Sequence, residues 1–208
     1  LVIGEEAVAA NPKLLDTNLE DRIVIYVDPV DGTANFAGGL PLFAVMASVV
    51  ENGETVASVI YDPLGDDVLM AERGCGAWQV FGDGRAIRQK FADPVPLSEM
   101  GGTASTAYLP YEQRKVVLAN LAKVKMLGNY RCAGHEYRYA AGGNMHFLSY
   151  GKLMPWDHVG GALIMRECGA HVAKLDGSEY RPSDVSGGLL IAADKDSWDE
   201  LKREIFTF

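Results

Sequence analysis

The sequence has 208 residues, of which 48% are hydrophobic and 23% charged, and its formal net charge at pH 7 is -9. This length allows a well-buried core in one domain or two small ones, and the composition is that of an ordinary globular protein. The acidic balance argues against nucleic acid or an anionic membrane as a partner. The longest apolar run, residues 42–50, is too short to span a bilayer.

The first half of the chain is predicted to be an antiparallel meander. Glu5 and Glu6 stand where a first strand ends, and residues 7–22 are expected to form a polar excursion or a short helix. Six β-type runs follow, separated by turns rich in Gly, Asp and Pro: residues 23–27, 42–50, 55–61, 68–71, 78–81 and 85–88. The pair Gly74 and Gly76 does not open a dinucleotide-binding loop, because that motif needs a glycine where Gln79 stands.

A stretch rich in proline, residues 93–96, marks a predicted boundary between a domain of residues 1–92 and a domain of residues 93–208. Past it the pattern alternates between strand and helix, which predicts an α/β layered half. Strands are expected at 103–107 and 188–193, and helices at 111–125, 136–148, 158–168 and 197–206. In the first of these helices the predicted buried face consists of Val117, Leu118, Leu121 and Val124.

Two features concern the compartment and the start of the chain. Cys75, Cys132 and Cys168 show no metal-ligand spacing, and no secretory signal is visible, so we expect reduced thiols packed as small hydrophobes in a cytoplasmic protein. The chain begins with residues 1–4, Leu-Val-Ile-Gly, which look like the end of a strand, and it has no initiator Met. We therefore expect a further segment upstream.

The segment from Val27 to Phe36 is the strongest functional signal. Asp28 ends an apolar strand, Pro29 keeps the chain from becoming helical, and Asp31 follows three residues later. The next two residues, Gly32 and Thr33, offer a backbone that a ligand can approach closely and a hydroxyl. Two carboxylates held this close repel each other unless a cation lies between them, and a divalent ion with oxygen ligands is the usual solution.

Three other interpretations of this segment were weighed. A plain surface turn remains open, because Asp, Pro and Gly are the common turn residues. A calcium EF-hand loop is excluded, because Pro29 interrupts its pattern and Gly39 stands where its final glutamate belongs. Phosphatases that use an aspartate nucleophile place one residue between their two acids. This sequence has two, so Asp28 is disfavoured as a nucleophile.

Three stretches together resemble the inositol monophosphatase family of Mg²⁺-dependent sugar phosphatases, whose superfamily includes fructose-1,6-bisphosphatase. They are Gly4-Glu5-Glu6, the segment from Asp28 to Phe36, and Trp156-Asp157-His158-Val159-Gly160-Gly161. The resemblance covers nearly the whole chain. It implies an α+β fold built as a layered αβαβα sandwich, in which a meander half precedes an α/β half. It also implies a homodimer, and members of the family carry about two helices before the segment that matches Gly4.

The resemblance also implies roles for individual residues. Glu5, Asp28 and the carbonyl of Val30 would hold one Mg²⁺, and Asp28, Asp31 and Asp157 a second, in a site of two or three ions. Glu6 with Thr33 would orient and deprotonate the attacking water, and Asp31 would serve catalysis as well as metal binding. The substrate's phosphate would lie against the amides of Gly32 and Thr33, next to Asp157.

One departure from the family concerns the alcohol portion of the substrate. His135 and Glu136 occupy a region where many members have small residues, so they are candidates to set specificity. The alternative, that Glu136 simply favours a helix N-terminus, stays open. The expected function is therefore hydrolysis of an inositol or similar polyol phosphate by direct attack of water. Histidinol phosphate, fructose 1,6-bisphosphate, 3′-phosphonucleotides and a non-catalytic, ligand-binding relative remain as alternatives.

Overall fold

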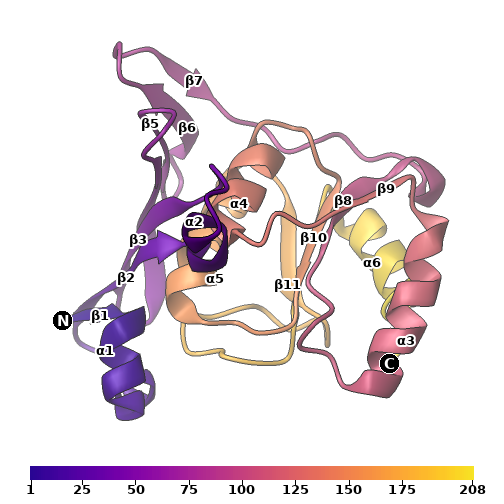
Figure 1. Cartoon of the computed structure of the whole chain (residues 1–208), viewed down its shortest axis with the longest axis horizontal. Helices are drawn as coiled ribbons and strands as arrows, with labels where there is room; N and C mark the ends of the chain where they lie inside the picture. Colours follow the sequence, from indigo (N-terminus) through magenta and orange to yellow (C-terminus); the bar gives the residue numbers. More distant parts are fainter.

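A computed structural model describes all residues from Leu1 to Phe208 and contains two β-sheets with helices between and beside them (Figure 1). The layers run from a seven-stranded sheet through a helical layer to a five-stranded sheet and a second helical layer. The predicted fold class, a layered α+β sandwich with a meander half and an α/β half, is confirmed. No helix of the chain combines the length and apolar composition needed to cross a bilayer.

The first sheet follows the chain order, and its strands are all antiparallel except β1, which pairs parallel to β2. Its strands are β1 (Val2–Gly4), β2 (Ile23–Asp31), β3 (Ala44–Glu51), β4 (Glu54–Asp62), β5 (Asp67–Glu72), β6 (Gly76–Phe81) and β7 (Ala86–Arg88). The excursion after β1 holds helix α1 (Glu5–Ala10) and a 3₁₀ turn, η1 (Pro12–Asp16). The short helix α2 (Thr33–Ala37) follows β2.

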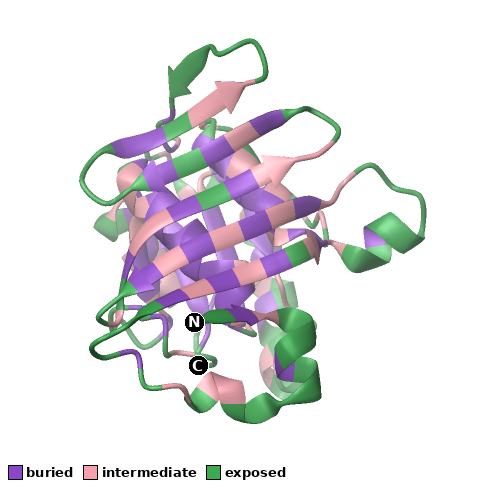
Figure 2. Ribbon diagram, turned by 90° about the vertical axis from the view of Figure 1, so that its left-hand side faces the viewer, coloured by how far each residue is buried: buried purple, intermediate pink, exposed green.

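Only one face of this sheet is covered by helices. Along β3 the side chains of Ala44, Met46, Ser48 and Val50 are buried, and the residues between them are only half buried. Figure 2 shows this alternation across the sheet, with no helix in front of the strands. The outward side chains are largely apolar: they include Ile25, Val27, Val45, Val49, Val59, Met70 and Trp78.

The second sheet has the strand order β11-β12-β10-β8-β9. Its members are β8 (Gly101–Ala104), β9 (Met126–Gly128), β10 (Phe147–Tyr150), β11 (His171–Lys174) and β12 (Leu189–Ala192). Strands β8, β9 and β10 are parallel, and β12 is antiparallel to both β10 and β11. Every residue of β8, β10 and β12 is buried, because helices cover both faces of the sheet.

Two apolar clusters hold the layers together. The larger has 33 buried residues and joins the inner face of the first sheet to α4 (Ala133–Ala141), α5 (Pro155–Glu167) and the near face of the second sheet. The smaller has 13 and joins the far face of the second sheet to α3 (Tyr111–Asn120) and α6 (Lys195–Glu204). Helices of residues 93–208 therefore share a core with the sheet of residues 1–92, and the predicted division into two domains stays a prediction.

Two predicted helices differ from the structure. The helix expected at 136–148 begins at Ala133 and ends at Ala141, because Gly142 and Gly143 follow and Gly143 has φ +78°. Residues 142–146 of the predicted helix form a turn and a loop, and its last two residues, Phe147 and Leu148, begin strand β10 (Phe147–Tyr150). The helix expected at 111–125 ends at Asn120 and continues as a 3₁₀ turn, η3 (Leu121–Lys123), and Leu118 on its predicted buried face is 46% exposed. Strands β9 and β11 were not predicted.

Candidate active site

Two of the predicted metal ligands come from the end of β2, where the strand is irregular. Asp28 pairs with Met46 and Asp31 with Ala44, so two residues of β2, Pro29 and Val30, lie opposite a single residue of β3. In a regular strand, residues three apart point to opposite faces. The extra residue of this bulge turns both carboxylates to the covered face of the sheet, where Asp28 is 2% and Asp31 8% exposed.

The third acid comes from the first turn of α5, more than a hundred residues later in the chain. Pro155 is the first residue of this helix, a position at which the backbone N–H makes no hydrogen bond within the helix, so proline loses none there. Asp157 follows in the same turn. A β-carbon on Gly160 would lie 2.3 Å from Oγ of Ser58, so only glycine lets α5 approach the sheet this closely. This close packing carries Asp157 to the two acids of β2.

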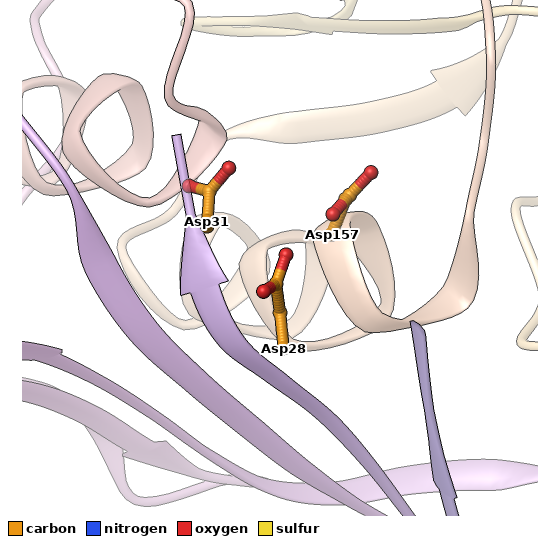
Figure 3. A group of neighbouring side chains, drawn as sticks. All are labelled: Asp28, Asp31 and Asp157. Atoms are coloured by element: carbon orange, nitrogen blue, oxygen red, sulfur yellow. The ribbon is translucent and has the colours of Figure 1, made fainter. Parts of the chain in front are cut away.

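The three carboxylates face one another across the join between sheet and helix (Figure 3). One oxygen from each of Asp28, Asp31 and Asp157 lies within 4.8 Å of the other two. Burial and the neighbouring charge of Asp31 raise the pKa of both Asp28 and Asp157. Such a group needs protons or a cation to offset the repulsion, and a set of hard oxygen donors suits Mg²⁺ better than softer metals. The residues present therefore fit the metal implied by the sequence.

Asp31 is held in place from the other side of the site. Its Oδ2 accepts hydrogen bonds from the backbone N–H of Gly134, at 2.5 Å, and from Sγ of Cys132, at 3.1 Å. Both donors belong to the start of α4, where free N–H groups favour a negative charge. One oxygen of Asp31 is therefore occupied by α4, and the other remains for a ligand.

The turn after β2 has the shape expected from its sequence. Gly32 has φ +84°, and a β-carbon there would lie 2.8 Å from the carbonyl oxygen of Leu42, so the position requires glycine. The Thr33 hydroxyl donates to the carbonyl oxygen of Val30 at 2.9 Å. Thr33 is thus placed beside the acids, and the Val30 carbonyl keeps one lone pair for a cation.

The acids border a cavity of about 510 Å³. Glu5, Asp31 and Asp157 line it, and Glu136 lies in its wall at 5% exposure. The complete lining is Glu5, Asp31, Ala34, Ser105, Ala107, Tyr108, Asn129, Arg131, Cys132, Ala133, Glu136, Tyr150, Lys152, Met154, Trp156, Asp157 and His158. The cavity therefore joins the acid cluster to a region large enough for the alcohol portion of a small ester.

His135 and Glu6 are among the predicted site residues that do not line this cavity. The ring of His135 points to the other side of α4, where Nε2 lies 3.1 Å from the carbonyl oxygen of Phe43, and it lines a separate cavity of about 410 Å³. Glu6 is exposed in the first turn of α1, next to Glu5, but is not part of the lining. Of the two expected specificity residues, only Glu136 lies at the site.

Several residues that line the cavity or contact its acids are not predicted from the sequence. Cys132 was expected to be only a small buried hydrophobe, yet its thiol donates to Asp31. Tyr150 lines the cavity from the carboxyl end of β10, a strand whose first two residues were expected to be helical. Arg131 and Lys152 add two positive charges to the lining. Ligand groups gather at the carboxyl ends of parallel strands, so Tyr150 would have been a candidate had β10 been recognised.

The comparison with protein families decides the classification. The sequence matches the model of the inositol monophosphatase family over residues 1–206. The chain belongs to this family. The predicted resemblance is confirmed, and membership supports a phosphatase of the superfamily, because similar proteins carry the names of inositol monophosphatase and fructose-1,6-bisphosphatase.

Three curated relatives illustrate the match. An inositol-1-monophosphatase of Mesorhizobium japonicum is 36% identical over 159 residues, which are 74% of this chain and 57% of that protein. The fructose-1,6-bisphosphatase/inositol-1-monophosphatase of Thermotoga maritima is 32% identical, covering 76% of this chain and 59% of that protein. A Nus factor SuhB of Xylella fastidiosa is 30% identical, covering 80% and 60%. The chain thus spans less than two thirds of the length of these relatives.

Solved structures agree with the fold. The extragenic suppressor protein suhB from Bartonella henselae superimposes with a TM-score of 0.77 at 28% identity, covering 89% of this chain and 71% of that one. Staphylococcal IMPase-II with inositol monophosphate bound superimposes with a TM-score of 0.83, covering 99% and 76%, but at 22% identity it supports the fold alone.

Proposed function

We propose that this protein is a Mg²⁺-dependent phosphomonoesterase that hydrolyses an inositol phosphate or a similar polyol phosphate by in-line attack of water. The observation that carries the proposal is the meeting of Asp28, Asp31 and Asp157, from β2 and α5, at one end of a cavity. Carboxylates whose pKa values are raised by burial and by mutual repulsion are unfavourable in their charged form unless they bind a cation. The same cavity has room for an ester beside the metal ligands.

The proposed ligand sets are those that the family resemblance implies. Glu5, Asp28 and the Val30 carbonyl would hold one ion, and Asp28, Asp31 and Asp157 a second. Mg²⁺ at these positions supplies positive charge to the phosphate and to the oxygens on which charge develops during displacement. Groups of the protein itself bind the phosphate and accept the proton. The amides of Gly32 and Thr33 receive phosphate oxygens, and Glu6 with Thr33 takes the proton of the attacking water.

The direct test is phosphate release from a panel of esters, with Mg²⁺ and with excess chelator. The panel contains myo-inositol 1-phosphate, fructose 1,6-bisphosphate, histidinol phosphate and 3′-phosphoadenosine 5′-phosphate. We expect release that requires Mg²⁺ and is fastest for the inositol ester. Release that persists in chelator would contradict the metal mechanism, and a preference for another ester would change the substrate but keep the reaction.

A rival of a different class is a family member that binds metal or a phosphorylated ligand without turning it over. Two relatives that are 30% identical carry the name Nus factor SuhB, which does not name a phosphatase. The full set of Glu5, Glu6, Asp28, Asp31, Thr33 and Asp157 favours the enzyme, because a binding protein has no use for the pair that activates water. A folded protein that binds Mg²⁺ and the inositol ester, yet releases no phosphate, would favour the rival.

A further inference from the structure

A hydrogen bond between α4 and α5 connects the two sides of the acid cluster. The hydroxyl oxygen of Tyr137, on α4, lies 3.1 Å from Nδ1 of His158, on α5, and both side chains are buried. His158 directly follows Asp157 in the chain. Tyr137 lies about one helical turn after Gly134, whose backbone N–H donates to Asp31. The bond therefore joins the helix that carries one acid to the helix that holds another.

The two rings that make this bond are fixed by their packing. A β-carbon on Gly161 would overlap the ring of Tyr137, so the missing side chain at Gly161 lets this ring lie directly on α5. The imidazole of His158 packs against the ring of Tyr150, with centroids 4.4 Å apart. Side chains whose rotamers are locked by close packing hold a hydrogen bond in one geometry. The bond between Tyr137 and His158 therefore fixes how α5 lies against α4.

The position of Asp157 depends on this packing, because the first turn of α5 has no side-chain cap. Its N-cap residue is Met154, which makes no side-chain hydrogen bond. His158 supplies the hydrogen bond from this turn to α4, the helix whose start holds Asp31. The contact at Gly160 determines how close α5 lies to the first sheet. The bond of His158 determines where the same turn lies relative to α4, and hence how far Asp157 is from Asp31.

We propose that Tyr137 and His158 are positioning residues whose hydrogen bond sets the separation of Asp31 and Asp157 and so makes the site selective for Mg²⁺ over larger divalent ions. The two acids face each other across the join of sheet and helix (Figure 3). Mg²⁺ needs octahedral ligands at about 2.0–2.1 Å, whereas Ca²⁺ accepts ligands at about 2.3–2.6 Å in irregular geometry. A small shift of α5 therefore weakens Mg²⁺ binding more than Ca²⁺ binding. This inference rests on the Mg²⁺ site of the proposed function.

The test measures the binding of Mg²⁺ and of Ca²⁺ by calorimetry, without any ester. The variants are Tyr137→Phe, which removes only the hydroxyl, and His158→Phe, which keeps an aromatic ring but removes both nitrogens. We expect each variant to weaken Mg²⁺ binding about 10-fold, as loss of other outer contacts to metal ligands does, and to change Ca²⁺ binding by less than about twofold. The double variant should lose no more Mg²⁺ affinity than either single variant, because both remove the same bond.

The matched control is Tyr180→Phe, because Tyr180 is another buried tyrosine of the larger apolar cluster, and its hydroxyl has no hydrogen-bond partner. It should leave the affinities for both ions unchanged, and thermal unfolding without metal checks that every variant is folded. Equal weakening of Mg²⁺ and Ca²⁺ binding in Tyr137→Phe, or no change in either, would overturn the positioning role and leave the phosphatase intact. A wild-type protein that binds no Mg²⁺ would overturn both proposals. A wild-type protein that binds Mg²⁺ but releases no phosphate from the panel of esters would overturn the enzyme alone.

Discussion

The two sheets of this protein differ in what covers them. In the second sheet every residue of β8, β10 and β12 is buried, with α4 and α5 on one face and α3 and α6 on the other. In the first sheet burial alternates along strands such as β3 and β5, and the outward face keeps apolar side chains such as Val59, Met70 and Trp78 between 37% and 40% exposed (Figure 2). Stability in the first sheet therefore comes from one face only.

The candidate site lies where these two regions meet. Asp28 and Asp31 end a strand of the half-covered sheet, and Asp157, Glu136 and Tyr150 belong to the helices and strand on the other side. Metal ligands from both sides must be held at a fixed separation, and the glycine contact between α5 and the sheet achieves this. None of these five side chains lies on the outward face of the first sheet.

The largest expected effect is loss of turnover when either side of the metal cluster is neutralised. Asp31→Asn and Asp157→Asn should each lower kcat for the preferred ester by about 1,000-fold or more, because a ligand to the ions is lost. Without Mg²⁺ the melting temperature should stay level or rise, since a buried like-charge repulsion disappears. Phosphate release and thermal unfolding measure the two effects.

Asp196→Asn is the control, because this acid is exposed on α6, away from the cavity. Its kcat should match that of the wild type. Near-normal turnover in Asp31→Asn or Asp157→Asn would contradict the two-ion assignment. A large loss of stability in either variant would show that the acids serve the fold more than the reaction.

The next largest expected effect is on stability, and it should differ between the two sheets. On β4, Ile60 is fully buried and Val59 points outward. Ile60→Ala should therefore lower the free energy of unfolding by about 2–5 kcal/mol, and Val59→Ala by under about 1 kcal/mol. On β12, Leu190 and Ile191 point to opposite faces but are both fully buried, so each change to Ala should cost about 2–5 kcal/mol. Urea unfolding of the four variants gives the values. Similar costs for Val59 and Ile60 would mean that the outward face is covered in solution.

The first sheet is covered on one face and the second on both, and this difference explains how much of the fold could be predicted from the sequence. Half-covered strands such as β3 alternate between buried and open positions, and turn residues separate them, so the meander was found nearly element by element. Strands buried on both faces lose that alternation. Residues 147–150, Phe-Leu-Ser-Tyr, are apolar enough to extend a helix, and only the two preceding glycines show where α4 ends.

For the site, the acids of the cluster could be predicted from the sequence, and the groups that hold them could not. Asp28, Asp31 and Asp157 stand in recognisable local patterns, and the structure brings their carboxylates together. Which face of α4 meets the cavity depends on where that helix begins. A start at Ala133 turns Glu136 inward and His135 toward Phe43, and no local pattern reveals this. The contact of Cys132 with Asp31 spans 101 positions of sequence and is likewise set by tertiary packing.

The smallest expected effect tests that contact between the two sides of the site. Burial and the charge of Asp31 raise the pKa of the Cys132 thiol, so it stays protonated and acts as a donor. Cys132→Ser keeps a donor and should retain kcat within about threefold, whereas Cys132→Ala should lower it about 10-fold, as other outer contacts to metal ligands do. Cys168→Ala is the matched control, since Cys168, the residue directly after α5, is also buried and makes no hydrogen bond to an acid of the site. If Cys132→Ala and Cys168→Ala had the same kcat, the Cys132 thiol would contribute only to packing, and the backbone N–H of Gly134 alone would orient Asp31.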